Sequence, residues 1–377
     1  MFNKSGRSYK LSYIFQLNGQ VIDITDEYCY LGILFQPSGV FNKSTDYLYN
    51  KSIKAKSYLL KVIAGQNAST SVLLNLFNIL ILPILSYGCE ITLPLYIKNL
   101  RNDNFYNLLE KFPLEKCHIA FCKYVLGVNS KATNSAVRGE LGSYPIAINM
   151  IIHAVKYYVR LHTIPCNSLA HNAYQENLSL ELPWYKSIKN MFNVLFPNIS
   201  IGDICKDKSL FKMLKSGLTS LYNKEWYNII NRKPNLNSNS GNKLRVYNKF
   251  KNIFECEKYL MFIKDRQIRS DVCRLRISAH DLMVEKGRYH CPKIEFEKRY
   301  CRFCHSKVEN EFHFIFECEL YYNRRNALFA DVLKIFPNFT YMDKSLQFIE
   351  LLKCTDFELT TLFSKYVSDC FKLRQLA

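Results

Sequence analysis

The chain has 377 residues, which is enough for two or three domains with sizeable hydrophobic cores. Hydrophobic residues make up 48% and aromatic residues 14% of the chain, and this composition excludes an intrinsically disordered protein. Lysine and arginine outnumber aspartate and glutamate by 51 to 32, which gives a formal net charge of +19. Such an excess favours RNA or DNA as a partner over a membrane surface, although solvated surface lysines produce the same balance.

The cysteine usage and the first residues predict an intracellular protein. The chain has 14 cysteines, many of them within apolar runs, which fits free thiols and one metal site better than a disulfide framework. Residues 1–10 are polar and basic and contain no secretory signal. The most hydrophobic stretch, residues 72–87, is shorter than the roughly 20 residues of a membrane span and contains Pro83. We expect a location in the nucleus or cytoplasm and no membrane partner.

The N-terminal residues 9–36 predict a small antiparallel β-structure. Two apolar runs flank Asn18-Gly19, a pair typical of a tight β-hairpin turn. A third short strand is expected at 28–35, where Gly32 would permit a close backbone approach.

Helical periodicity begins at Ser44 and predicts that most of the remaining chain is α-helical. Tyr47 and Tyr58 fall with leucines on the face that we expect to be buried. Candidate phosphate contacts lie along one flank, at spacings of eleven and seven residues: Lys43, Lys54 and Lys61. A solvated lysine edge beside a buried stripe is the alternative interpretation. Gly65 ends this helix. The next helices are expected at 70–82 with a kink or break near Pro83, at 104–126 with a break near Pro113, and at 146–161, 184–196 and 210–222.

A polar run at 233–243 is the best candidate for a linker, because it cannot bury enough apolar surface to order itself. The predicted domains are therefore 1–40, 41–128, 129–232 and a basic domain at 244–377. In the last domain, helices are expected at 243–264, 266–281, 321–336 and 356–373. Its candidate nucleic-acid contacts are Arg266, Arg269, Arg274, Arg276, Arg324 and Arg325. The expected fold class is mainly α with a small N-terminal antiparallel β-hairpin or sheet (α+β).

Four residues near the C-terminal end have the spacing of a zinc site. Cys301, Cys304, His313 and Cys318 form C-x2-C-x8-H-x4-C, which offers three thiolates and one imidazole, the donor set of a closed tetrahedral site. Cys301 and Cys304 fit one reverse turn. On a regular helix, His313 and Cys318 would point about 140° apart, so the backbone must turn or unwind between them.

Two points about this predicted site stay open at the level of the sequence. Buried thiols and a core histidine in a cysteine-rich chain would give the same residues. Three further residues are close enough in sequence to replace one of the ligands: His290, Cys291 and His305. If zinc binds, losing one ligand is expected to unfold the region after residue 290.

Eight short motifs follow one another along the chain. They are FNKSGR at 2–7, YLGI at 30–33, LPILSYGCEI at 82–91, FCKYVLGV at 121–128, GELG at 139–142, YP at 144–145, LRISAH at 275–280 and EKGRY at 285–289. Together with the cysteine-histidine motif, they resemble the C-terminal half of the polyprotein of a non-LTR (LINE-type) retrotransposon, which follows the reverse transcriptase active site. The likeness covers nearly the whole chain and is weakest at about 165–240.

The resemblance implies a fold and an arrangement of sites. Residues 1–40 would be the end of the palm with a primer-grip-like hairpin, 41–128 a thumb, 129–232 a helical connector and 301–318 a zinc knuckle that binds nucleic acid. Three residues would lie near the primer end: Leu31, Gly32 and Ile33. The thumb motif of the family, L-P-x-L-x-Y-G-S-E-I-W, has Cys89 here in place of serine and Thr92 in place of tryptophan.

The carboxylates that polymerisation requires are missing from the chain. They hold two metal ions, and the family places them in an upstream F/Y-x-D-D motif, whereas no Asp-Asp pair occurs in these 377 residues. We therefore expect no catalytic residue and no catalytic Mg²⁺ site, and the resemblance implies a truncated RNA-directed DNA polymerase, inactive alone, that binds RNA or DNA. The alternatives are a polymerase subunit that needs an upstream palm-containing chain, and a helical scaffold whose zinc is purely structural.

Overall fold

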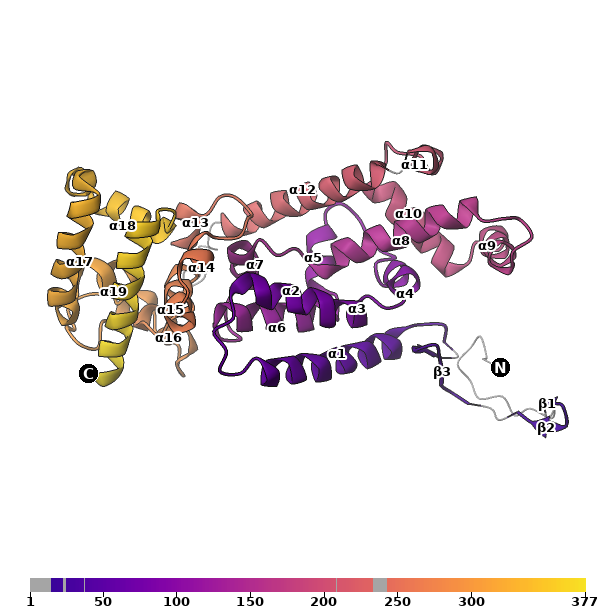
Figure 1. The fold of residues 1–377 in the computed structure, drawn as a ribbon, viewed down its shortest axis with the longest axis horizontal. Helices are drawn as coiled ribbons and strands as arrows, with labels where there is room; N and C mark the ends of the chain where they lie inside the picture. The colour runs from indigo at the N-terminus through magenta and orange to yellow at the C-terminus, as the bar shows by residue number, and fades with distance from the viewer. Residues whose placement is uncertain (1–14, 23–24, 37, 208, 233–242) are drawn as a thin grey trace. The chain divides into compact units, whose positions relative to one another are not determined.

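The computed structural model describes residues 15–22, 25–36, 38–207, 209–232 and 243–377. The described chain is mainly helical, with two short antiparallel hairpins near its N-terminal end (Figure 1), which confirms the predicted fold class. It divides into two compact units. Unit 1 contains residues 1–62, 77–118 and 145–222, and unit 2 contains residues 63–76, 119–144 and 223–377. The predicted linker lies almost wholly outside the described residues, as does the motif at 2–7.

The predicted hairpin across Asn18-Gly19 is confirmed. Strand β1 (Gln16–Leu17) pairs with β2 (Gln20–Val21), with Gln16 opposite Val21. The two turn residues have positive φ angles of 52° and 79°, the combination that a two-residue type I′ turn requires.

The prediction of one strand at 28–35 is wrong, because these residues form a second hairpin. Strand β3 (Tyr28–Tyr30) pairs with β4 (Ile33–Phe35). Leu31 and Gly32 form the turn between them, with φ angles of 48° and 83°. Gly32 therefore suits this position because glycine tolerates a positive φ. A Cβ atom at this position would also lie 3.3 Å from Cε1 of Tyr87.

The helices of unit 1 pack around α4 and α8. They are α1 (Asn42–Val62), α3 (Leu82–Leu85), α4 (Cys89–Tyr96), α5 (Phe105–Lys111), α8 (Ile146–Thr163), α9 (Leu169–Ser179), α10 (Pro183–Leu195) and α11 (Ile201–Lys206). Helix α4 packs against α8 and α10, and Leu93, Ile151 and Ile188 are fully buried there. Three further helices contribute residues to both units: α2 (Thr70–Leu80), α6 (Glu115–Leu126) and α12 (Leu210–Ile230). The predicted interruptions near Pro83 and Pro113 are confirmed.

Unit 2 is built around its C-terminal helix α19. Its helices are α7 (Asn134–Leu141), α13 (Tyr247–Phe250), α14 (Tyr259–Phe262), α15 (Arg266–Arg276), α16 (Met283–Lys286), α17 (Tyr322–Ile335), α18 (Lys344–Lys353) and α19 (Phe357–Leu376). Helix α19 packs against α15 and α17 (Figure 1), and Val272, Phe363 and Val367 are fully buried. The Cys-His motif lies between α16 and α17 in the chain, with one turn of π-helix at His313–Glu317.

The predicted helix at 243–264 is wrong, since only the short helices α13 and α14 form there. Between them the backbone is not helical, and Cys256 makes an isolated antiparallel bridge to Leu141. The N–H of Glu257 donates to the carbonyl of Glu140 at 2.9 Å. This pairing with a distant segment replaces helical hydrogen bonds, and no local sequence pattern predicts it. The helix predicted at 266–281 ends early, at Arg276, and Ser278 has a positive φ of 53°.

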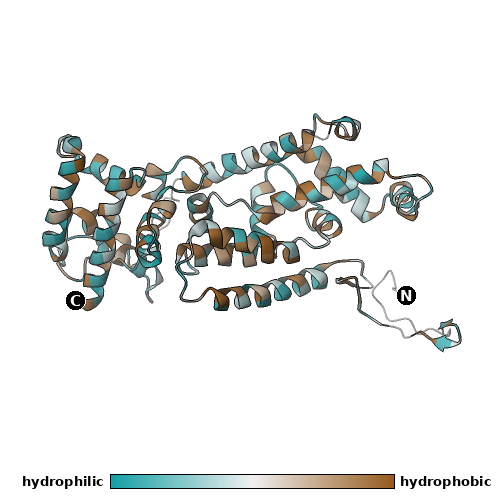
Figure 2. Cartoon of the chain, in the orientation of Figure 1, coloured by the Kyte–Doolittle hydropathy of each residue, from teal (hydrophilic) through white to brown (hydrophobic). Residues whose placement is uncertain are grey.

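No single helix of the described chain is both long enough and apolar enough to cross a membrane. Among the described residues, one bent pair of helical segments, Thr70–Leu85 with Cys89–Tyr96, reaches that length and hydrophobicity, and its two parts meet at 77°. Figure 2 shows hydrophobic and hydrophilic residues mixed within the helices, as expected for helices that bury one face and expose the other.

Candidate metal centre

The four predicted ligands come together in unit 2. One donor atom from each of Cys301, Cys304, His313 and Cys318 lies within 4.8 Å of all the others. The sulfurs of Cys301 and Cys318 are 3.8 Å apart, and the Cys304 sulfur is 3.3 Å from Nε2 of His313. Two sulfurs bound tetrahedrally to zinc at about 2.3 Å would be about 3.8 Å apart. The cluster therefore has the donors and the spacing of a site that could hold a metal ion.

The backbone brings each half of the motif to the cluster in a different way. Cys301 and Cys304 share one turn, in which the His305 N–H donates to the Cys301 carbonyl at 3.0 Å. The other two ligands bracket the π-helical turn, and the Cys318 N–H donates to the His313 carbonyl at 2.9 Å. An i→i+5 hydrogen bond closes one wider turn, so residues five apart face the same side. The predicted unwinding between His313 and Cys318 is confirmed.

A carboxylate outside the cluster orients the imidazole. Glu317 Oε2 lies 3.2 Å from Nδ1 of His313, so a proton on Nδ1 is held there and Nε2 stays free to bind a metal. Burial raises the pKa of Glu317, but hydrogen bonds from Lys307 and His313 lower it below its usual value overall. Glu317 therefore remains ionised and able to accept the His313 proton.

Two buried glutamates tie the loop between the ligands to the rest of unit 2. Glu309 forms an ion pair with Arg374 of α19. Glu311 accepts hydrogen bonds from Arg245 at 2.7 Å and from His280 at 3.0 Å. Although burial raises the pKa of Glu311, the charge of Arg245 and the hydrogen bond from His280 lower it well below its usual range. The loop is thus fixed by charged contacts as well as by the cluster.

The three substitute ligands that the sequence left open lie outside the cluster. Of the described residues, those grouped around this position are Cys301, Cys304, His313 and Cys318. His290, Cys291 and His305 are all exposed. The Nδ1 atom of His290 lies 3.0 Å from the Pro292 carbonyl. His305 has a positive φ of 53° and lies on the exposed side of the turn.

A second group of potential metal ligands lies in unit 1 and was missed from the sequence. Cys89 and Glu90 of α4 lie with His153 of α8 so that one donor atom of each is within 4.8 Å of the others. The sequence gives no sign of this group, because no cysteine pair lies near His153 in the chain. With three ligands, one of them exposed, this group lacks the closed donor set of the first cluster.

The lysines predicted on the first helix are all exposed on α1. They are Lys43, Lys54 and Lys61, and Lys43 forms an ion pair with Glu27. The prediction that Tyr47 and Tyr58 are buried is wrong, since they are 42% and 73% exposed. At 100° per residue these five positions fall within about 60° of one another. Lysines and tyrosines therefore share one solvent-facing stripe, which we call the α1 stripe.

Three of the six predicted arginine contacts are turned into the protein, and their roles must be corrected. Arg276 is fully buried between Glu140 and Glu257, at 3.0 and 2.5 Å. Buried Arg269 donates to the Ile263 carbonyl, and buried Arg325 to the Cys318 carbonyl, both at 3.0 Å. These guanidinium groups hold the fold through partners that are distant in the chain or on the backbone, although Nη2 of Arg269 has no hydrogen-bond partner within the described residues.

The other three arginines are at least partly accessible to solvent. Arg266 donates to the Tyr124 carbonyl at 3.0 Å and lies over its ring. Arg274 donates to the Gly127 carbonyl at 2.9 Å and lies 3.6 Å from the Asp271 carboxylate. Arg324 is exposed and lies 3.5 Å from Asp369. The predicted nucleic-acid contacts are divided between the two units: the three lysines lie in unit 1 and these arginines in unit 2.

Residues 31–33 contact the motif at 82–91. The hydroxyl of Tyr87 donates to the Leu31 carbonyl. A Cβ atom at Gly88, whose φ is +65°, would lie 2.5 Å from Cδ1 of Ile33. Two motifs that are about fifty residues apart in the chain therefore meet, and Tyr87 and Gly88 hold the turn. Sequence reasoning recognised both motifs but not their contact.

Comparison of the chain with protein-family models, with curated proteins and with solved structures found no significant match. The candidate sites therefore rest on the geometry of this chain and on the motifs in its sequence.

Proposed function

We propose that this chain binds single-stranded RNA or DNA, as the thumb, connector and zinc-knuckle part of a reverse transcriptase of the non-LTR retrotransposon type. The observation that carries the proposal is the Cys₃His cluster, which forms from the motif that ends the resemblance. The net charge of +19 supports it, because neutralised phosphates release counterions. We propose no polymerase activity for the chain alone.

The α1 stripe is the best candidate contact in unit 1. Tyr58 is 73% exposed between two exposed lysines, Lys54 and Lys61. Lysines can bind successive phosphates, while an exposed aromatic ring can stack on an unpaired base, a contact worth about 1–3 kcal/mol. A stripe that combines both features suits a flexible single strand.

The salt dependence of binding tests this proposal. Affinity for a labelled single-stranded RNA should fall steeply between about 50 and 200 mM salt, and Lys54→Gln should reduce the slope of the log-log plot by about 0.7. Lys344→Gln is the matched control, because Lys344 is an exposed lysine of α18 that belongs neither to the α1 stripe nor to the contacts predicted from the sequence. Affinity that barely changes with salt, or equal slopes for both variants and the unaltered protein, would contradict the proposal.

We also propose that the metal is zinc and that its role is structural. Four protein ligands complete the tetrahedral coordination of a zinc ion and leave no coordination position for a substrate or water. Elemental analysis of the purified protein should find one zinc per chain, and Cys304→Ser should lose it. Cys166→Ser, at an exposed cysteine outside the cluster, should keep it. Purified protein without metal would overturn this proposal.

A second candidate function is that of a polymerase subunit that works with a separate palm-containing chain. The observation that favours it is the contact of Tyr87 and Gly88 with the turn at 31–33, the residues that the resemblance assigns to the primer grip. Primer extension should then appear only when a palm-containing chain is added. If neither the mixture nor the chain alone extends a primer, this candidate is removed and nucleic-acid binding is unaffected.

A further inference from the structure

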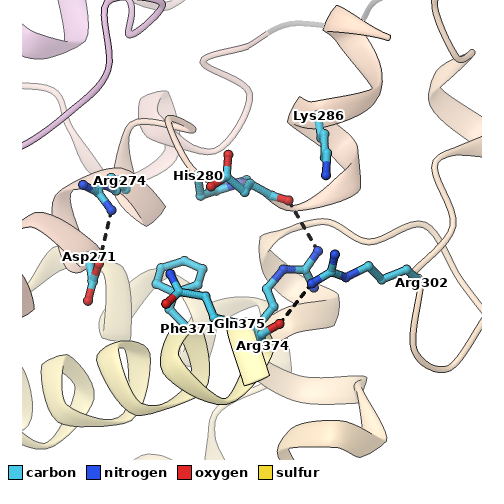
Figure 3. A pocket seen from close by; sticks show the side chains of 9 residues that line it. Asp271, Arg274, His280, Lys286, Arg302, Phe371, Arg374 and Gln375 are labelled. Carbon is cyan, nitrogen blue, oxygen red and sulfur yellow. Dashed lines mark hydrogen bonds and ion pairs between the residues drawn. The ribbon is translucent and has the colours of Figure 1, made fainter. Parts of the chain in front are cut away.

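A cationic pocket lies beside the metal centre in unit 2. It is a cavity of about 210 Å³, and Figure 3 shows the side chains that line it. Its walls come from α15, from the segment that contains α16, from the turn between Cys301 and Cys304, and from α19. The residues that matter for its charge are Asp271, Arg274, Asp281, Lys286, Arg302 and Arg374. The cavity is smaller than the roughly 300–1,000 Å³ of drug-sized ligand sites, so it fits a small group.

Two of the four cations in this pocket are already neutralised by the protein. Arg374 forms a buried ion pair with Glu309, and Arg274 lies 3.6 Å from Asp271. These contacts fix the two guanidinium groups in the walls. Lys286 and Arg302 are therefore the cations of this pocket that can bind an anionic ligand.

Lys286 and Arg302 have no ion pair within the described residues. Arg302 donates one N–H of Nη2 to the backbone carbonyl of Arg374 at 3.0 Å. Both Arg302 and Arg374 lie over the ring of Phe303, at 4.8 and 5.1 Å from its centroid. The Lys286 ammonium points into the same space (Figure 3). Like charges that converge in this way favour binding of an anion.

We propose that this pocket binds a phosphate group of a nucleic-acid strand, with Lys286 and Arg302 as its ligands. This inference deepens the proposed function and rests on it. A guanidinium group can offer two parallel N–H donors to a phosphate, and an ammonium adds a point charge. Arg302 lies between two of the zinc ligands, so the metal turn holds it at the pocket. The carboxylate of Asp281, which has no ion pair within the described residues, opposes the anion and limits the affinity.

Three variants of the full chain test the site. Lys286→Gln should weaken binding of a single-stranded RNA about fivefold, equally for different sequences, since a phosphate contact carries no base information. Arg302→Gln should weaken it by at least as much. Asp281→Asn removes the opposing charge and should strengthen binding about twofold to fivefold. Lys344→Gln should leave the affinity unchanged.

The outcomes separate this inference from the proposed function. If the unaltered protein binds RNA and the Lys286→Gln and Asp281→Asn variants match it, the pocket is not a phosphate site and the proposed function stands. If the unaltered protein binds no RNA or DNA, the proposed function fails and this inference fails with it. Lys286 is exposed, and its side chain makes no hydrogen bond or ion pair within the described residues, so Lys286→Gln should fold normally.

Oligonucleotides with different 5′ ends distinguish a backbone phosphodiester from a terminal phosphate as the bound group. Equal binding of oligonucleotides with a 5′-hydroxyl and a 5′-phosphate, both weakened by Lys286→Gln, supports a backbone phosphodiester. Weakening that is confined to the 5′-phosphorylated strand supports a terminal phosphate. Competition by millimolar inorganic phosphate that is equally effective with all the variants would overturn the assignment to this pocket.

Discussion

At the scale of single residues, Glu317 orients the imidazole of His313 in the candidate metal centre. Its carboxylate lies 3.2 Å from Nδ1 of His313 and 2.8 Å from the ammonium of Lys307. The contact selects the tautomer in which Nε2 faces the cysteine sulfurs. A carboxylate in this position also increases the basicity of the imidazole.

We expect Glu317→Gln to weaken zinc affinity about 10- to 100-fold while the protein stays folded, since the amide loses the charge that supports the histidine. Competition with a chromophoric chelator measures this change. Glu319→Gln is the matched control, because Glu319 is exposed and two residues away. Equal affinities of the two variants would show that Glu317 does not orient His313.

Arg276 shows a different role for a charged side chain. It is fully buried, contacts Glu140 and Glu257, and lies over the rings of Phe250 and Tyr259. Burial lowers its pKa, but the charges of Glu140 and Glu257 raise it well above its usual value overall. Removing one partner of such a buried pair would leave an uncompensated charge, which costs about 3–5 kcal/mol. Arg276 therefore joins the 119–144 segment of unit 2 to the C-terminal segment.

At the scale of elements, the hairpin β3–β4 and the start of α4 depend on each other. The N-cap of α4 is Gly88 in the left-handed region, and its missing side chain makes room for Ile33. The hairpin is short, and strand β4 also packs against α1. Its turn residues Leu31 and Gly32 meet Tyr87 instead. The contact with Tyr87 and Gly88 therefore orients residues 31–33.

We expect Gly88→Ala to destabilise the protein by about 1–3 kcal/mol, because the new Cβ meets Ile33 and the backbone is strained at φ +65°. Chemical denaturation followed by circular dichroism measures the loss. Combining it with Ile33→Ala should recover only the part due to the clash. Gly217→Ala is the control, since a Cβ there meets nothing within 4 Å and lies in α12. Equal stabilities of Gly88→Ala and Gly217→Ala would contradict this interpretation.

At the scale of the molecule, the candidate metal centre is tied to the other helices of unit 2 and is not a separate small domain. The hydroxyl of Tyr366 on α19 donates to the carbonyls of Phe314 and Ile315, next to the ligand His313. Helix α19 also packs against α15. Loss of the metal should therefore loosen more than the region after residue 290 that the sequence alone suggested.

If zinc binds as proposed, we expect a chelator to make unit 2 sensitive to protease from α15 onward, because metal binding contributes folding energy and α19 connects the ligand loop to α15. Helices α8 and α10 of unit 1 should stay protected. Limited proteolysis with mass spectrometry locates the cuts, and added zinc should reverse them. Cleavage that stays within 290–320 would show instead that the ligand loop is an independent module.

The sequence by itself determined the local features of this protein. The spacing of Cys301, Cys304, His313 and Cys318 fixed the candidate ligands and required the turn between the last two, because all four lie within eighteen consecutive residues. Pro83 and Pro113 located helix breaks, and Asn18-Gly19 located a hairpin, since these residues restrict their own backbone.

Only the tertiary structure decided which side chains face solvent and which partners they meet. Glu140, 136 residues from Arg276 in the chain, turned a predicted phosphate contact into a buried ion pair. Tyr58 became exposed beside the lysines, and Lys286 and Arg302 came together in one pocket. Periodicity assigns a residue to a face of its own helix, whereas the segment that covers that face is set by the packing of distant parts of the chain.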